Sequence, residues 1–298
     1  MKCFICGEEM QPCFEKNFGL KNLDKCEYVR CPNCKLIIAK TIYELPEKQW
    51  EAINYEVHNS VFMNEIISCT DIDPTVYERF EISADFFNEL LKHGIFKADW
   101  KTVDYGAGNG ALADTTNKKM GMPWLKKFDA YMKPFGENYL PADEIKPGNF
   151  DFVVTTSVFE HLLGNRGDVD KVMGLLNSNG VMGLNLFVCE EMPDDPRWFY
   201  YMPVHCTFWT NKAMSILYKK SGFKGCVYNV EACMWIMFRD EKAFEKLESI
   251  ADKFQQWKLV FSKDFVDYWK IQPKVKDFKV DTEKFEAILK TYQSRKNL

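Results

Sequence analysis

The sequence predicts an α/β protein in which a mainly parallel sheet carries helices on both faces, with a cysteine-rich module before it and a helical extension after it. Beyond residue 100, apolar segments of strand length alternate with segments of helical periodicity, which is typical of parallel sheets. A glycine-rich turn, Gly106-Ala-Gly108-Asn-Gly110, follows the first of these strands. Two Cys-x-x-Cys pairs, Cys3/Cys6 and Cys31/Cys34, stand near the N-terminus.

Composition sets limits on the class of protein. Of the 298 residues 46% are hydrophobic and 15% aromatic, so we expect a well-packed globular protein with one large domain, or a core domain with smaller appendages. The formal net charge is -4, and no basic run is long enough to follow a phosphate backbone, which argues against nucleic acid as a partner. No apolar run approaches the roughly 18 residues that span a bilayer. We therefore expect no membrane association and a cytoplasmic location.

The cysteines are interpreted first as metal ligands, because thiols in the cytoplasm stay reduced. Each Cys-x-x-Cys turn can hold two thiolates side by side, and two such turns complete a tetrahedral zinc site. Residues 1–45 resemble a zinc ribbon. Cys13 and Cys26 lack a paired cysteine and are expected to be small core residues. A site of four thiolates keeps no open position for water, so the predicted Zn²⁺ is structural, with the ligands Cys3, Cys6, Cys31 and Cys34.

Two helices are expected between this module and the core, over residues 46–58 and 75–93. They belong to a segment, 46–98, that we expect on the substrate side of the sheet. The second has an apolar stripe and ends at Gly94. Tyr55 and His58 belong to the first helix and could face a substrate. Alternatively, they pack at the junction between the cysteine module and the core.

The core is expected to span residues 99–240 and to contain seven strands. They are predicted near 100–105, 125–131, 150–155, 180–188, 224–230 and 233–239, with a short edge strand near 137–140. Too few residues separate the last two strands for a crossover helix, so they should form a hairpin whose final strand is antiparallel to the rest. Residues 241–298 are expected to be a helical extension, with amphipathic stretches over 241–261 and 282–294.

The glycine turn has the features of a ligand-binding loop, because glycine tolerates positive φ and lets a ligand approach the backbone. The same spacing also fits the dinucleotide loop of a dehydrogenase. Two further motifs accompany it: Asp104 precedes the first glycine, and a later apolar strand ends in Thr156-Ser-Val-Phe-Glu160-His161. With these motifs the core resembles the class I S-adenosylmethionine-dependent methyltransferases. Their Rossmann-like seven-stranded sheet ends in an antiparallel hairpin, which the dehydrogenase fold lacks.

The resemblance implies cofactor contacts at the carboxyl ends of the strands. Asp104 is expected to fix the loop and reach towards the ammonium group of S-adenosylmethionine. Asp129 follows the second strand, where the family has a ribose-binding acid, although a shifted alignment puts Lys133 there, which could not serve. Asp143 is a candidate for the adenine end or a solvated loop residue. The expected cofactor-binding residues are Asp104, Gly106, Gly108, Gly110, Asp129, Asp143, Thr156 and Ser157.

Two histidines are candidate catalytic bases, since imidazole titrates near neutral pH. His161 belongs to the Glu-His-Leu motif, which in many relatives mainly holds the cofactor pocket. His205 lies in an aromatic stretch, residues 197–210, that resembles a segment of small-molecule and sugar methyltransferases with an N-terminal zinc ribbon. Its candidate substrate-binding residues are Arg197, Tyr200 and Tyr201. The other interpretation of the stretch is an apolar approach to a helix, with Thr210 as the N-cap.

These patterns favour an S-adenosylmethionine-dependent methyltransferase that acts on a small-molecule substrate, with a sugar or sugar nucleotide as the expected class. An RNA methyltransferase with a zinc-ribbon recognition module is one alternative, which the acidic composition disfavours. A non-catalytic binding protein on the same fold is another. A nicotinamide-dependent oxidoreductase is supported by the glycine pattern alone. The sequence leaves open the acceptor atom, the choice between the histidines and the oligomeric state.

Overall fold

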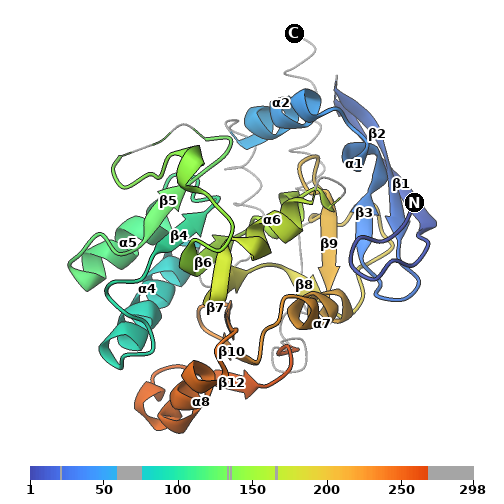
Figure 1. The fold of residues 1–298 in the computed structure, drawn as a ribbon. Coiled ribbons are helices and arrows are strands. Elements are labelled where there is room, and N and C mark those ends of the chain that lie inside the picture. Colours follow the sequence, from blue (N-terminus) through green and yellow to red (C-terminus); the bar gives the residue numbers. More distant parts are fainter. Residues whose placement is uncertain (21, 59–75, 133, 135, 165–166, 268–298) are drawn as a thin grey trace.

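Figure 1 shows the fold in a computed structural model, which describes all residues except 21, 59–75, 133, 135, 165–166 and 268–298. The side chains of residues 55–58, 76 and 77 also lie outside the description. Two sheets organise the described chain, one of seven strands and one of five.

The seven-stranded sheet has the order β12-β10-β11-β7-β6-β4-β5. Strands β5, β4, β6 and β7 are parallel to one another, whereas β11 runs antiparallel to β7 and pairs with β10 as a hairpin. This arrangement confirms the Rossmann-like seven-stranded sheet and its closing antiparallel hairpin. The strands are β4 (Thr102–Tyr105), β5 (Lys126–Phe128), β6 (Phe150–Thr156), β7 (Leu176–Asn185), β10 (Gly225–Asn229), β11 (Met234–Phe238) and β12 (Leu259–Ser262).

The seventh strand is not the one expected from the sequence. Residues 137–140 form no described strand, and Tyr139 makes a single parallel bridge with Lys127. Instead β12 pairs antiparallel with β10, in a stretch that was expected to be helical to residue 261. That helix prediction is correct for α8 (Glu241–Ser249) and the short 3₁₀ helix η4 (Ala251–Phe254), and wrong beyond them. The apolar run Leu-Val-Phe pairs with the otherwise open edge of β10, which leaves fewer backbone groups unpaired.

Side chains of the central strands alternate between two apolar clusters. On β11, Trp235 and Met237 belong to one cluster, and Ile236 and Phe238 belong to the other. The first cluster continues into α6 (Asp168–Gly174) and α7 (Asn211–Lys220), and the second into α4 (Val76–Lys92), α5 (Ala111–Met120) and α8. Helices therefore cover both faces of the sheet, as the alternating pattern predicts.

Helix α4 is fixed against α5 by a lysine and two carboxylates. Lys119 of α5 contacts Glu81 at 2.8 Å and Asp85 at 2.7 Å. The C-terminal end of α4 is followed by Gly94 at φ 65, as expected for a glycine that ends a helix. On α7, the Thr210 side chain accepts a hydrogen bond from the amide of Ala213, which confirms Thr210 as the N-cap.

The five-stranded sheet joins the N-terminal module to the core. Its order is β1-β2-β3-β9-β8, with β1 (Gln11–Leu20), β2 (Leu23–Arg30), β3 (Ile37–Ala39), β8 (Val188–Cys189) and β9 (Thr207–Thr210). Ile37 of β3 pairs with Phe208 of β9, and Figure 1 shows the N-terminal strands beside β9. The aromatic stretch after β7 is thus shared between the core and the N-terminal module. Helices α1 (Lys40–Tyr43) and α2 (Glu47–His58) follow β3, and α2 agrees with the expected first helix.

Among the described residues, no helix combines the length and the apolar character needed to cross a membrane.

Candidate functional site

The glycine loop connects the carboxyl end of β4 to the start of α5. Gly106, Gly108 and Gly110 have φ values of 77, 55 and 79, which is the left-handed region that other residues rarely occupy. The amides of Gly106 and Ala107 donate to the carbonyl of Phe128 at 2.8 and 3.0 Å, so the loop is held at the end of the neighbouring strand β5. This is the edge of a parallel sheet at which ligands of α/β proteins bind.

Two of these glycines are also required by close packing. A Cβ atom at Gly106 would lie 2.5 Å from Cγ2 of Val158, and one at Gly110 would lie 2.4 Å from Cδ of Lys127. Both distances are far below van der Waals contact. The loop therefore needs glycine for its conformation and for the neighbours that support it.

Asp129 directly follows β5 and binds the loop through its carboxylate. One oxygen accepts a hydrogen bond from the amide of Gly108 at 2.8 Å, and the other accepts from the amides of Tyr131 and Met132 at 2.9 and 2.8 Å. Asp129 is therefore at the end of the second core strand, where the resemblance to methyltransferases predicts a ribose-binding acid. The alternative, Lys133, lies outside the described residues.

Asp104 lies at the other side of the loop, within β4, and is 1% exposed. Among the described residues no group donates a hydrogen bond to its Oδ1 atom. Burial raises the pKa of Asp104 to about 7, and the neighbouring charge of Asp129 acts in the same direction. A buried carboxyl without a full set of partners is stabilised by a bound cationic group.

Lys127 is a residue of this region that the sequence-based predictions missed. Its side chain is 1% exposed, its Nζ contacts Asp114 of α5 at 2.7 Å, and it lies 5.0 Å from the ring centroid of Tyr139. The hydroxyl of Tyr139 in turn donates to the carbonyl of Gly108 at 2.8 Å. A buried lysine beneath a glycine has no local sequence signal, because its burial depends on partners from other segments.

The remaining residues that were expected to bind the cofactor lie in two places, at the end of β6 and on a short 3₁₀ helix. Thr156 ends β6 opposite Asn185, and the amide of Ser157 donates to the carbonyl of Asn185 at 3.1 Å. Ser157 has φ 53, an unusual value for a residue with a Cβ atom and one that is enriched at functional sites. Asp143 is exposed on the 3₁₀ helix η1 (Ala142–Glu144).

Glu160, His161 and His205 form one cluster, in which each offers a ligand atom within 4.8 Å of the others. Glu160 and His161 belong to the 3₁₀ helix η2 (Phe159–His161), which follows β6, and His205 comes from the aromatic stretch. The amide of Cys206 donates to the carbonyl of Glu160 at 2.7 Å, and the Thr207 hydroxyl donates to the carbonyl of Phe159 at 2.7 Å. The structure therefore brings together two histidines that the sequence assigned from separate motifs.

Both imidazoles are oriented by backbone carbonyls. His161 Nδ1 lies 2.9 Å from the carbonyl oxygen of Val204, and His205 Nδ1 lies 2.8 Å from that of Tyr200. A carbonyl oxygen only accepts hydrogen bonds, so each Nδ1 atom carries a proton, and in the neutral form of each ring the lone pair is on Nε2. The rings meet edge to face, with centroids 4.9 Å apart.

Glu160 is the buried carboxyl of the cluster and is 3% exposed. Burial raises its pKa to about 7, against the smaller effect of hydrogen bonds that include the one from Tyr200. The Tyr200 hydroxyl donates to Oε1 at 3.1 Å, whereas no described residue donates to Oε2. The sequence-based predictions expected the Glu-His motif to help hold the cofactor pocket, but they named His161 alone, and not Glu160, as a site residue.

The candidate substrate residues do not form one group. Tyr200 contacts the cluster, and its ring centroid lies 4.4 Å from the ring centroid of His205. Tyr201 instead donates to the carbonyl of Pro193 at 2.6 Å and packs on aromatic residues of β1 and β2. The side chain of Arg197 is 67% exposed, and its guanidinium pairs with Asp195 at 2.8 Å. The side chains of Tyr55 and His58 lie outside the described residues.

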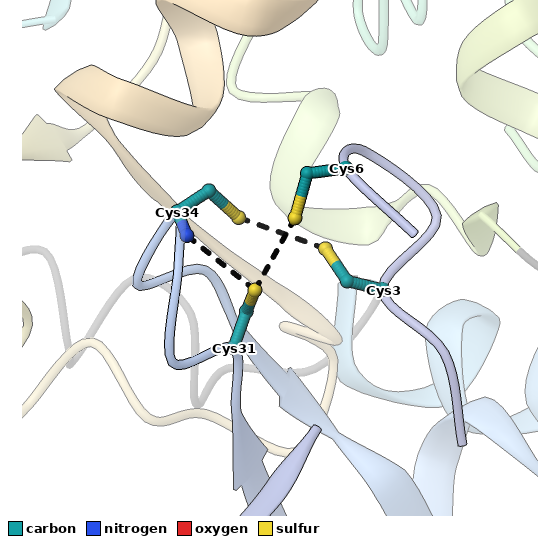
Figure 2. Close-up of side chains that lie close together, drawn as sticks. All are labelled: Cys3, Cys6, Cys31 and Cys34. Atoms are coloured by element: carbon teal, nitrogen blue, oxygen red, sulfur yellow. Dashed lines mark hydrogen bonds between the residues drawn. The ribbon is translucent and has the colours of Figure 1, made fainter. Parts of the chain in front are cut away.

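The four paired cysteines converge on one point (Figure 2). The sulfur atoms of Cys3 and Cys34 are 3.6 Å apart, and those of Cys6 and Cys31 are 3.4 Å apart. Hydrogen bonding to the Cys34 thiol lowers the pKa of Cys3 to about 5. Cys26 is buried and Cys13 partly buried, and neither belongs to the cluster.

The two cysteine turns have matching backbone geometry. The amides of Gly7 and Lys35, each four residues after the first cysteine of its pair, donate to the carbonyls of Cys3 and Cys31 at 2.8 and 3.0 Å. Gly7 and Lys35 also share positive φ values of 78 and 64. The turns therefore form a quasi-symmetric pair around the sulfur atoms, a geometry suited to a tetrahedral ion.

A pocket also opens between the N-terminal sheet and α7, with Lys35, Trp198, Lys212 and Asp267 among its lining residues. The glycine loop, Glu160 and the two histidines contribute nothing to this lining. Asp104 and Glu160, the two buried carboxyl groups whose pKa values burial raises, lie outside this pocket, so we assign the candidate site to the loop and the histidine cluster.

Comparison with known proteins gives matches among solved structures alone, since no family model and no curated protein sequence matches the chain. A phosphoethanolamine N-methyltransferase 2 from Haemonchus contortus is 14% identical, with a TM-score of 0.38 over 70% of this chain and 48% of that one. A plantazolicin methyltransferase is 11% identical, with a TM-score of 0.42 over 67% of this chain and 98% of that one.

Magnesium protoporphyrin IX methyltransferase from Synechocystis PCC 6803 is 11% identical, with a TM-score of 0.39 over 63% of this chain and 97% of that one. These three structures contain S-adenosylhomocysteine. The present chain spans about half the length, 48%, of the nematode enzyme. The assignment of the fold rests on the strand order and hairpin of the sheet itself.

Proposed function

We propose that the protein is an S-adenosylmethionine-dependent methyltransferase acting on a small-molecule acceptor. The observation that carries the proposal is the pair of acidic residues at two neighbouring strand ends. Asp104 is buried with an incompletely paired carboxyl, and Asp129 binds the amide of Gly108. A buried acid suits the ammonium group of the cofactor, and an acid after the second strand suits its ribose hydroxyls.

The closing hairpin distinguishes this proposal from a nicotinamide-dependent oxidoreductase. Strand β11 lies between β7 and β10 and is antiparallel to both, an arrangement expected for methyltransferases and not for the dehydrogenase fold. The glycine loop is common to both classes and does not separate them.

Methyl transfer needs alignment of the acceptor atom, the methyl carbon and the sulfur, and removal of a proton where the acceptor carries one. The sulfonium group of the cofactor supplies an already activated methyl group. His205 or His161 is the proposed base, because both rings belong to one cluster and the neutral form of each, with Nδ1–H donating to a carbonyl, has its lone pair on Nε2. Tyr200 and the backbone carbonyls hold this cluster in place.

The narrower proposal for the acceptor is a sugar or sugar nucleotide. It is supported by the likeness of residues 197–210 to a segment of sugar methyltransferases with an N-terminal zinc ribbon. The net charge of -4 supports a small molecule over RNA. A non-catalytic binding protein would bind the cofactor and transfer no methyl group.

The cysteine cluster is the proposed site of a structural Zn²⁺. Four sulfur atoms within 4.8 Å of one another, on two turns of matching geometry, agree with the ligand set of closed zinc sites. Such an ion would stabilise the N-terminal sheet, which contains strands from both the module and the aromatic stretch.

Calorimetric titration of the purified protein with S-adenosylhomocysteine, NAD and NADP tests the function. Micromolar binding of S-adenosylhomocysteine with no binding of either nicotinamide is expected. Binding of a nicotinamide cofactor without S-adenosylhomocysteine would disprove the proposal. A screen for methyl transfer starting from sugar nucleotides then tests the acceptor class, and cofactor binding without turnover on any acceptor would favour the binding protein.

A further inference from the structure

The cluster of Glu160, His161 and His205 contains the donor set of a second metal site. Two imidazoles and one carboxylate leave open positions when they bind a metal ion, as the 2-His-1-carboxylate sites of non-haem iron enzymes do. The three ligand atoms lie within 4.8 Å of one another. Two ligand atoms that are each about 2.1 Å from one ion are at most about 4.2 Å apart. Side-chain shifts of a few tenths of an ångström therefore allow all three ligand atoms to bind the same ion.

The surroundings of the Glu160 carboxylate indicate that it is a metal ligand. Its side chain is 3% exposed, and no described residue donates a hydrogen bond to its Oε2 atom. A buried carboxylate oxygen is costly unless it is paired with a hydrogen-bond donor or a cation. Glu160 Oε1 meanwhile accepts from Tyr200, which is the kind of contact that orients a ligating carboxylate.

The histidines are oriented as metal ligands usually are. A ligating imidazole generally donates its other ring N–H to a carbonyl or carboxylate, which fixes the tautomer. His161 Nδ1 donates to the carbonyl of Val204 and His205 Nδ1 to that of Tyr200, so in the neutral form of each ring Nε2 carries the lone pair that can bind a metal ion. The Cys206 amide, which donates to the carbonyl of Glu160 at 2.7 Å, fixes the two segments against each other.

We propose that Glu160, His161 and His205 bind a divalent transition-metal ion that coordinates the acceptor. Two imidazole ligands favour ions such as Zn²⁺, Fe²⁺ or Co²⁺ over Mg²⁺ and Ca²⁺, which prefer oxygen ligands. The site is separate from the cysteine cluster, which uses residues of the N-terminal module. The protein therefore holds two metal sites of different ligand chemistry.

The ion changes the role of the two histidines, and this consequence rests on the methyl transfer proposed above. As ligands they hold the acceptor oxygen through the ion, which lowers the pKa of a coordinated hydroxyl. The proton of that hydroxyl passes to water, the new O–CH₃ bond forms as the S–CH₃ bond breaks, and S-adenosylhomocysteine leaves. The acceptor class is then a hydroxyl compound whose oxygen binds the ion.

Titration with Co²⁺ tests the site without any use of the cofactor. The protein is first treated with a mild chelator that leaves the cysteine site filled with Zn²⁺, and absorption is followed as Co²⁺ is added. We expect one equivalent of Co²⁺ to bind with d–d bands and no sulfur-to-metal charge-transfer band. Absence of this equivalent, or a thiolate charge-transfer band in its spectrum, would overturn the proposal.

The variants are Glu160→Gln, His161→Gln and His205→Gln. Loss of an outer-sphere partner typically weakens metal binding about 10- to 100-fold, so removal of a direct ligand should weaken Co²⁺ binding by at least about 100-fold. His93→Gln is the matched control, because His93 on the C-terminal side of α4 lies beside Glu89 at 3.8 Å and outside the cluster. It should bind Co²⁺ as the wild type does.

Further measurements distinguish the loss of a metal ligand from unfolding of the variant and from failure of the proposed methyltransferase function. Retention of the cysteine-bound Zn²⁺ and an unchanged far-ultraviolet circular dichroism spectrum show that a variant is folded. Unchanged Co²⁺ affinity in the folded His161→Gln/His205→Gln double variant would refute the site. Failure of S-adenosylhomocysteine to bind would instead refute the methyltransferase proposal and leave the metal result intact.

Discussion

The hydroxyl of Tyr200 donates a hydrogen bond to Oε1 of Glu160 at 3.1 Å, while the backbone carbonyl of Tyr200 accepts from Nδ1 of His205 at 2.8 Å. One residue of the aromatic stretch thus fixes two members of the histidine cluster. Glu160 belongs to η2, which follows β6, and His205 precedes β9. The cluster therefore depends on how the five-stranded sheet is docked against the core.

Tyr200→Phe should lower both stability and turnover. The substitution removes the donor to a buried carboxylate, which typically costs about 1–3 kcal/mol. Denaturant unfolding gives the stability change, and a methyl-transfer assay gives the turnover. Tyr218→Phe is the control, because the Tyr218 hydroxyl donates at 3.0 Å to the carbonyl of Lys263, away from the cluster. A loss of turnover in the control equal to that in Tyr200→Phe would show that stability alone is responsible.

Asp104→Asn should change the dependence of stability on pH. Burial raises the pKa of Asp104 to about 7, so the folded protein keeps a proton that the unfolded chain loses near pH 4. The native state binds more protons in this window, and stability falls as pH rises from about 4 to about 7, by roughly 4 kcal/mol in total. The asparagine variant lacks this decline.

Guanidinium unfolding of both proteins across this pH window measures the effect. The stability of Asp104→Asn relative to wild type should increase steadily with pH. Asp143→Asn, which changes an exposed carboxyl, should keep the wild-type slope. Parallel pH profiles for Asp104→Asn and wild type would show that Asp104 does not hold a proton in the folded protein.

Gly106→Ala should destabilise the loop and weaken cofactor binding. The new Cβ atom would lie 2.5 Å from Cγ2 of Val158, in addition to the strain of φ 77. Gly148→Ala isolates the strain, because Gly148 has φ 69 and a Cβ atom added there would meet no atom within 4 Å. The difference between the two variants in unfolding free energy should be about 1–3 kcal/mol, the usual cost of overpacking. Equal losses of unfolding free energy in Gly106→Ala and Gly148→Ala would mean that the Val158 side chain moves to accommodate the new Cβ atom at no cost.

The parts of the fold that the sequence could predict are those set by local patterns. Six core strands, the closing hairpin, the Thr210 cap and the helix that ends before Gly94 all have signals within a few residues. The strand β12 was missed because its pairing with β10 depends on a partner far along the chain. The pairing of β3 with β9 was missed for the same reason.

The site shows the same division between local and long-range information. Local motifs predicted the glycine loop and each histidine as site residues. Asp129 could also be predicted, because it directly follows the second core strand, β5, which ends at Phe128 beside the loop. The sequence could not predict that His161 and His205 meet, since this depends on the hydrogen bonds of Cys206 and Thr207 to η2. The burial of Lys127 under Gly110 is likewise a product of packing.

His205→Ala should abolish turnover and leave cofactor binding intact. The imidazole either takes the acceptor's proton or binds the ion that coordinates the acceptor, and loss of a general base alone costs about 10²- to 10⁴-fold in rate. Turnover and S-adenosylhomocysteine titration are measured on the same preparation. Turnover within a factor of about two of wild type would exclude both roles, since each exceeds that factor by far. His93→Ala should keep wild-type turnover.

Cys31→Ser should remove one equivalent of Zn²⁺ and lower stability. The Cys31 sulfur lies 3.4 Å from that of Cys6 and accepts a hydrogen bond from the amide of Cys34, so its loss opens both the ligand set and its own turn. Because β2 and β3 flank this turn, the five-stranded sheet should loosen where it meets β9. Elemental analysis gives the metal content and thermal unfolding the stability.

Cys26→Ser is the matched control for this change, because Cys26 is buried in β2 of the same sheet but lies outside the cluster. It should keep its full metal content, although a buried hydroxyl in place of a thiol lowers stability somewhat. Wild-type metal content in Cys31→Ser would contradict the four-cysteine site. Equal destabilisation by the two variants, with metal lost in Cys31→Ser alone, would show that the ion binds there but contributes little to folding.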